Sequence, residues 1–221
     1  GGEGFDTIAG DNSQLFFNST IIGHDVMFSG TNENDFDAES GDDIMIQGES
    51  VIRNEGMLGF DWVSFEEHTA FGADADMRIK IFTTVEQDIL RNRFDRVEAM
   101  SGSAHNDVLI GDDRVEGVID PLEPEALVAE NIFAGDELTR EGVERISGFA
   151  DVLAPVIGDL SQYAATQTVF NAGNVLLGGD GSDIIQGGGG NDIIDGDKWL
   201  NVRISIVDEN GVEIGTTEKM Q

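Results

Sequence analysis

The chain has 221 residues, of which 44 are acidic and 12 are basic, so its formal net charge is -32. Such a charge repels nucleic acids and anionic membranes and attracts divalent cations. The absence of cysteine excludes a disulfide framework and any thiolate metal site. A hydrophobic content of 39% suffices for a packed core, and no apolar run reaches the length of a transmembrane helix. The composition favours a folded cation-binding protein without nucleic-acid partners or membrane insertion.

Three nonapeptides fit the pattern GGxGxDxUx, in which U is a large apolar residue. They are GGEGFDTIA at 1–9, GGDGSDIIQ at 178–186 and GGGGNDIID at 187–195. In each, the glycine-rich half turns the chain, leaves backbone carbonyls free and offers one carboxylate. The following residues form a short strand whose central residue, Ile8, Ile185 or Ile194, points inward. Oxygens from two stacked turns can then enclose a hard cation such as calcium, which takes six to eight oxygen ligands.

These nonapeptides resemble the repeats of the RTX, or hemolysin-type, family. The resemblance implies a mainly β fold, a right-handed parallel β-roll that holds several calcium ions between its turns. The alternative is a flexible Gly/Asp linker, but a linker has no reason to keep isoleucine at a fixed place in each period.

Weaker repeats follow the first nonapeptide, and the sequence predicts five turns of the roll over residues 1–46. Read in nines, the inward positions are Ile8, Phe17, Met27, Phe36 and Met45. Successive turns of a roll fall on opposite edges. At the acid position of the repeat, one edge therefore carries three aspartates and the other edge carries no acid. We therefore expect a one-edged ladder, with ions between the Asp6 and Asp25 turns and between the Asp25 and Asp43 turns. The other edge, with Leu15 and Asn34, is expected to be poor in metal.

Two further blocks of repeats are predicted, at 102–113 and at 169–197. In the second block Asp107 holds the acid position and Leu109 the inward one, and in the third Asn174 stands where an acid belongs. The predicted metal ligands are the acid-position residues and turn glycines of all three blocks: Asp6, Asp25, Asp43, Asp107, Asn174, Asp183, Asp192, Gly2, Gly4, Gly179, Gly181, Gly188 and Gly190.

Two segments interrupt the repeats, and we expect α/β insertions that form a cap on the roll. Residues 47–101 predict strands and a short helix. Residues 114–168 predict a helix whose apolar face runs from Val143 to Leu153 and which stops at Pro155. In residues 198–221, apolar and polar side chains alternate as they do in strands, and Asn210-Gly211 is a hairpin turn signal. They predict either a hairpin that closes the open end of the roll or the start of another domain.

A broader resemblance rests on several connecting strings, among them GDDIMIQGE, NEGMLGFDWVSFE, RFDRVEAMSGS and NDVLIGDDR. Over about residues 41–206, the chain is similar to the region that follows the haem-peroxidase domain, of animal-peroxidase type, in large secreted bacterial RTX proteins. This resemblance implies a calcium-dependent structural part of a larger polypeptide, secreted or displayed at the bacterial surface. Peroxidase activity is not implied, because the chain offers no residues that match the haem site.

The leading hypothesis is a non-catalytic calcium-binding module that folds when it meets calcium outside the cell. The sequence has neither an HExxH motif nor a nucleophile-elbow pattern. Two alternatives stay open. The cap could bind a cell-surface or polysaccharide ligand in an adhesion module, or the chain could be an accessory part of a haem-peroxidase enzyme.

Overall fold

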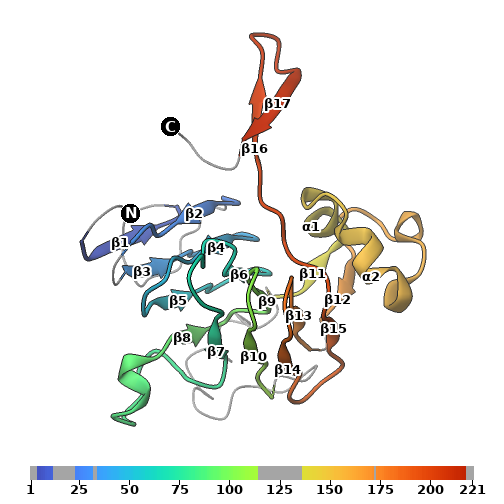
Figure 1. Ribbon diagram of the computed structural model, residues 1–221. Coiled ribbons are helices and arrows are strands. Elements are labelled where there is room, and N and C mark those ends of the chain that lie inside the picture. Colours follow the sequence, from blue (N-terminus) through green and yellow to red (C-terminus); the bar gives the residue numbers. More distant parts are fainter. Residues whose placement is uncertain (1–3, 12–22, 32–33, 114–135, 172, 218–221) are drawn as a thin grey trace, which may run out of the picture.

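The computed structural model describes residues 4–11, 23–31, 34–113, 136–171 and 173–217 (Figure 1). The fold is mainly β, as predicted, and is built from short strands in parallel sheets. Helices are few among the described residues: α1 (Arg140–Arg145), α2 (Phe149–Ile157) and the single 3₁₀ turns η1 (Asp88–Leu90) and η4 (Leu160–Gln162). This parallel arrangement is compatible with a β-roll.

One sheet has six parallel strands in the order β15-β13-β9-β6-β4-β2. Neighbouring strands pair in register, so that Met27 lies beside Met45 and Met45 beside Val63. The strands are β2 (Val26–Phe28), β4 (Ile44–Ile46), β6 (Trp62–Ser64), β9 (Ala99–Ser101), β13 (Val175–Leu177) and β15 (Ile193–Asp195).

The opposite side of the fold carries a four-stranded sheet, β1-β3-β5-β8, and a three-stranded sheet, β14-β10-β7. A parallel bridge between Lys80 and Phe94 links the β7 and β8 regions. The chain crosses repeatedly between this side and the six-stranded sheet, and we call one such circuit a coil. The strands are β1 (Asp6–Ala9), β3 (Asn34–Asp37), β5 (Arg53–Glu55), β7 (Asp74–Asp76), β8 (Arg93–Asp95), β10 (Val108–Ile110) and β14 (Ile184–Gln186).

The central residue of each short strand points between the two sides and forms the inner core. Of the predicted inward residues, Met27, Phe36, Met45 and Leu109 are buried in this core, and Ile8 and Ile185 pack against it. Phe17 lies outside the described residues. Ile194 shares the face of Leu176 but is 48% exposed, because β15 is the last strand of its sheet. Alternation of side chains along a strand explains why one residue in each triplet is buried here.

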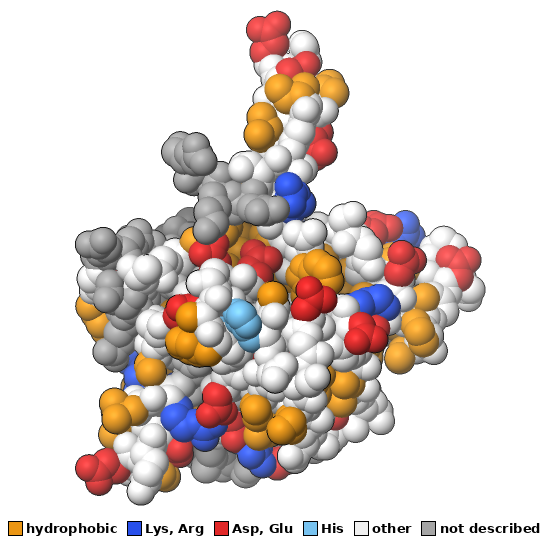
Figure 2. All heavy atoms as spheres, viewed as in Figure 1, with side chains coloured by type: hydrophobic (Ala, Val, Ile, Leu, Met, Phe, Trp, Pro, Cys, Tyr) orange, Lys and Arg blue, Asp and Glu red, His pale blue; other side chains and the backbone are white. Residues whose placement is uncertain are grey.

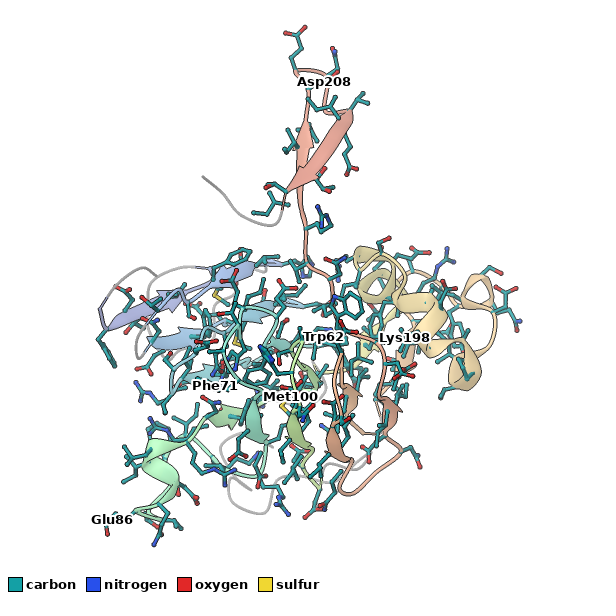
Figure 3. All side chains as sticks on the ribbon, in the orientation of Figure 1. Trp62, Phe71, Glu86, Met100, Lys198 and Asp208 are labelled. Atoms are coloured by element: carbon teal, nitrogen blue, oxygen red, sulfur yellow. The ribbon has the colours of Figure 1, made fainter. Side chains whose placement is uncertain are left out.

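A second core covers the outer face of the six-stranded sheet. The helical segment contributes Val143, Phe149 and Leu153, which pack with Trp62 and Val175 of the sheet. The Trp62 and Phe149 rings meet edge to face, with centroids 5.1 Å apart, a favourable geometry for aromatic pairs. Figure 3 shows Trp62 beside this segment, whereas Met100 belongs to the inner core. The antiparallel pair β11 (Leu138–Thr139) and β12 (Thr168–Phe170) closes the base of the segment.

Residues 47–101 differ from the prediction of a cap insertion. They contribute β5, β6, β7, β8 and β9 to the stacked sheets. The interruption is in the sequence motif and not in the coils, because this stretch loses most turn glycines while each of its strands keeps a buried inward residue, which is polar only in β5, at Asn54. Val63, Phe94 and Met100 occupy the inward position and are fully buried.

The predicted helix over 143–153 is divided into two. α1 ends at Arg145, and Gly148, with φ +82°, precedes α2. That left-handed conformation is open to glycine at little cost and breaks the helix. Pro155 lies within α2, three residues before the C-cap Gly158, instead of ending the helix.

The predicted C-terminal hairpin is present, but it does not close the end of the sheets. β16 (Ile204–Val207) and β17 (Glu213–Thr217) pair with each other and stand away from the sheets (Figure 1). Figure 2 shows hydrophobic side chains on this hairpin, among which Ile206 and Ile214 are 44% and 68% exposed. The preceding chain instead returns over the outer core, where Leu200 is buried and its N–H donates to Ser101 Oγ.

This arrangement predicts that the hairpin adds little to the stability of the sheets. Removing residues 203–221 is expected to change the midpoint of denaturant unfolding only slightly. Leu200→Ala, which cuts a buried side chain, is expected to cost about 2–5 kcal/mol. Denaturant unfolding followed by circular dichroism in calcium measures both, and a truncation as costly as the Leu200 change would contradict the arrangement.

Candidate metal-binding turns

A hydrogen bond from the backbone of one coil to an acidic side chain of the next recurs along the six-stranded sheet. The N–H of Asp25 donates to Asp43 Oδ1 at 2.7 Å, and the N–H of Asp43 donates to Asp61 Oδ1 at 2.9 Å. The N–H of Asp61 in turn donates to Glu98 Oε2 at 2.8 Å. These bonds align the acids in a row, which we call the carboxylate ladder.

The same bond joins coils elsewhere in the stack. The N–H of Asp107 donates to Asp183 Oδ1 at 2.9 Å, and that of Asn174 donates to Asp192 Oδ1 at 2.8 Å. Each of the predicted acid-position residues thus lies at the start of a strand and takes part in bonds between neighbouring coils. Asn174 keeps this role through its amide, whose Oδ1 accepts from the Asp112 N–H.

The structure does not place Asp6 in the ladder with Asp25 and Asp43. β1 pairs in register with β3, and the Asp6 N–H donates to Asn34 Oδ1 at 2.9 Å. The two residues that the sequence assigned to different edges are therefore neighbours. Since β1 pairs with β3 and β2 pairs with β4, Asp6 and Asp25 belong to different sheets, whereas the count of nines had put them on one edge. Leu15 lies outside the described residues.

Two ladder residues, Asp61 and Glu98, are not among the sequence-predicted ligands. The Gly59-Phe60-Asp61 string repeats Gly41-Asp42-Asp43 after 18 residues, and this spacing could have revealed Asp61. Glu98 follows Asp61 by 37 residues and replaces aspartate by glutamate, so no short period contains it.

The turn glycines allow the coils to approach closely. A Cβ on Gly41 would lie 1.8 Å from the carbonyl oxygen of Gly23, and one on Gly59 would lie 1.6 Å from that of Gly41. Both have φ between +129° and +146°, a conformation that favours glycine. The predicted glycines Gly4, Gly179, Gly181, Gly188 and Gly190 share a positive φ, and Gly2 lies outside the described residues.

The ladder contains carboxylate oxygens that no protein group satisfies. Asp43 Oδ2 and Asp61 Oδ2 are buried without a hydrogen-bond partner. Burial raises the pKa of the Asp43 carboxyl to about 7. Burial and the Glu98 charge raise the pKa of the Asp61 carboxyl well above its usual range. Buried carboxylates of this kind require either a proton or a cation.

Calcium fits these turns. Across the described residues, no three acidic or histidine side chains gather around one point. A cation would therefore draw on one or two carboxylates and on the backbone carbonyls that glycine brings together. Oxygen-only ligation of this kind suits a hard cation with flexible coordination.

Comparison with known families matches residues 170–198 to the RTX calcium-binding nonapeptide repeat, in 4 copies. This segment carries RTX calcium-binding repeats. The match contains Asn174, Asp183 and Asp192, and RTX nonapeptide repeats bind calcium. Neither the curated proteins nor the solved structures compared with the chain gave a match. Among the described residues, no helix is long and apolar enough to cross a membrane.

The close approach of the turns predicts that a single added methyl group lowers the stability of the fold strongly. Gly59→Ala is expected to destabilise the calcium-bound protein by about 3 kcal/mol or more, because the coils must separate to admit the Cβ. Gly215→Ala is the matched control, since nothing lies within 4 Å of a Cβ at that position. Thermal unfolding in calcium measures both variants, and equal melting temperatures would contradict the stacked geometry.

The raised pKa of Asp43 predicts that the calcium-free protein becomes less stable as the pH rises. The folded state holds a proton at Asp43 up to about pH 7, whereas the ordinary pKa is 3.8. The free energy of unfolding should therefore fall as the pH rises from about 4 to about 7. Circular dichroism of the calcium-free protein between about pH 4 and about pH 7 measures this slope, as a strand signal that declines while the carboxyl loses its proton. Asp43→Asn should flatten it, and a calcium-free protein that gains stability over this range would refute the assignment.

Proposed function

We propose that the chain is a calcium-dependent structural module of a secreted RTX protein. Its coils would wind as a right-handed parallel β-roll and complete their folding when calcium binds outside the cell. The module itself would be non-catalytic and would form part of a larger polypeptide. The localisation rests on the resemblance to secreted RTX proteins and on the negative charge that calcium would offset.

The buried, unsatisfied oxygens of Asp43 and Asp61 carry this proposal. They lie in the ladder that joins three coils, each through a backbone bond to the next. Removing these carboxylates from water without a counter-charge costs several kcal/mol each. A divalent cation offsets that cost when bound, and it does so only when the turns are stacked.

Without calcium, two forces oppose the stacked state. The acids of adjacent turns repel one another, and the glycine-rich turns lose much chain entropy on folding. Basic residues neutralise some acids in the middle of the chain, where Arg145 pairs with Asp42 and Arg53 with Asp35. The repeats at 178–195 contain no basic residue, so their folding should depend most on calcium.

An adhesion role is the second candidate, and one observation favours it. A cavity of about 200 Å³ lies between the six-stranded sheet and α1, with Trp62, Phe60 and Leu138 among its lining residues. Asp25, Asp42 and Arg145 also line it. The volume suits a small group rather than a drug-sized ligand. An accessory role beside a haem peroxidase stays a prediction from the family resemblance.

Calcium titration of the metal-free chain tests the proposal. Strand signal in circular dichroism is expected to rise with calcium. Asp192→Asn should raise the required calcium about tenfold, equivalent to ~1.4 kcal/mol, because the site loses a charged ligand. Asp197→Asn changes an exposed acid just beyond β15 and should leave the titration unchanged. A strand signal that is already complete in chelator would exclude calcium-dependent folding.

A further inference from the structure

The turn before β10 contains an aspartate whose two carboxylate oxygens are both satisfied by the protein. Asp107 is 1% exposed. Its Oδ1 accepts the Ala73 N–H at 2.6 Å and the Ser103 hydroxyl at 2.9 Å, and its Oδ2 accepts the Ser103 N–H at 2.8 Å. Asp43 and Asp61 of the carboxylate ladder, by contrast, each keep a buried oxygen without a hydrogen-bond partner. Several hydrogen bonds to a carboxylate stabilise its charge in a buried place without a cation.

A serine in place of a turn glycine supplies two of these hydrogen bonds. β10 pairs in register with β14, so Asp107 corresponds to Asp183, and Ser103 corresponds to Gly179 of the perfect repeat. Gly179 has a φ of +94°, whereas Ser103 is not among the residues with a positive φ. The serine therefore changes the turn in two ways. Its hydroxyl reaches the carboxylate, and its backbone departs from the conformation of the glycine repeat.

The same aspartate joins neighbouring strands of one sheet. β7, β10 and β14 form the three-stranded sheet (Figure 1). Ala73, just before β7, donates its N–H to the Asp107 carboxylate and accepts the Val108 N–H at its carbonyl, at 2.8 Å. The Asp107 N–H in turn donates to Asp183 Oδ1. We call Ala73, Ser103 and Asp107 the hydrogen-bonded junction, because their mutual bonds hold β7 beside β10.

The acids beside this junction have basic partners. Three aspartates, two in β7 and one shortly after β10, lie in ion pairs. The pairs are Arg91–Asp74, Arg78–Asp76 and Lys80–Asp112, with N–O distances of 2.9, 2.8 and 3.8 Å. A partly exposed pair contributes little by itself, but together these pairs remove repulsion that opposes the folding of an acidic chain. The repeats at 178–195 have no such neutralisation from within, because they contain no basic residue.

We infer that Asp107 is not a calcium ligand, although it stands at the acid position of the repeat, and that the hydrogen-bonded junction keeps β7 and β10 paired before calcium binds. This inference rests on the proposed calcium-dependent folding, to which it adds an order of events. The preformed edge of β10 receives β14 when calcium orders the repeats at 178–195. The contact between Asp107 and Asp183 spans 76 residues, and closing so long a loop costs chain entropy. A partner strand already in place lowers the remaining cost that calcium has to offset.

Counting bound calcium tests the first part of the inference. Asp107→Asn keeps the size of the side chain and removes its charge. Equilibrium dialysis of the whole chain against radioactive calcium is expected to give the same number of bound ions as in the wild type. Asp192→Asn is the matched comparison, because the turn before Asp192 contains glycine where the turn before Asp107 contains serine. It should bind fewer ions at a calcium concentration that just saturates the wild type. Loss of an ion in Asp107→Asn would assign calcium to this turn and overturn the inference.

Hydrogen exchange in chelator, followed by NMR, tests the second part. The amide protons of Ala73 and Val108 are expected to exchange slowly without calcium, whereas the Ile193 amide of β15 should exchange rapidly and become protected in calcium. Ser103→Ala removes only the hydroxyl and should speed exchange at Ala73 about tenfold in chelator. Ser182→Ala is the control, because Ser182 is an exposed residue of the next turn and should leave this rate unchanged.

The results separate the inference from the proposed function. Ala73 and Val108 amides that exchange in chelator as fast as the Ile193 amide would exclude the preformed pairing while leaving the proposed function intact. Equal Ala73 rates in Ser103→Ala and Ser182→Ala would exclude the role of the serine. If circular dichroism shows that Asp107→Asn does not fold in calcium, these rates decide alone. An Ile193 amide that is equally protected in chelator and in calcium would instead refute the proposed function.

Discussion

The bond on which the structure depends is the one between a backbone N–H of one coil and the side-chain carboxylate of the next. It fixes the register of neighbouring coils and brings the acids into line, as in the row Asp25, Asp43 and Asp61. It also occupies only one oxygen of each carboxylate. The remaining buried oxygens of Asp43 and Asp61 have no protein donor, and this unsatisfied charge links the fold to a cation.

Glycine makes this alignment possible. The carbonyl of one turn approaches the next turn so closely at Gly41 and Gly59 that no side chain fits. Close approach brings backbone oxygens and carboxylates into one narrow edge, where they can share an ion. The same approach concentrates negative charge, so the geometry that suits calcium is costly without it.

The rest of the chain protects the coils by ordinary packing. The helical segment covers the outer face of the six-stranded sheet with Val143, Phe149 and Leu153. Its Arg145 pairs with Asp42 in a turn, so it also neutralises part of the acidic edge. Calcium dependence is therefore expected to be uneven along the stack, greatest where repeats are perfect and basic residues are absent.

The mainly β class, the three-residue strands and most of the inward residues could be predicted from the repeats, because a nine-residue period fixes which side chain points inward. The sequence also identified the RTX repeats at the C-terminal end. Three features could not be predicted in this way: Asp6 stands beside Asn34, residues 47–101 continue the coils, and the hairpin stands apart. These features depend on which strands pair across long separations. Asp61 and Glu98 are 37 residues apart yet adjacent, and no local pattern in the chain encodes that contact.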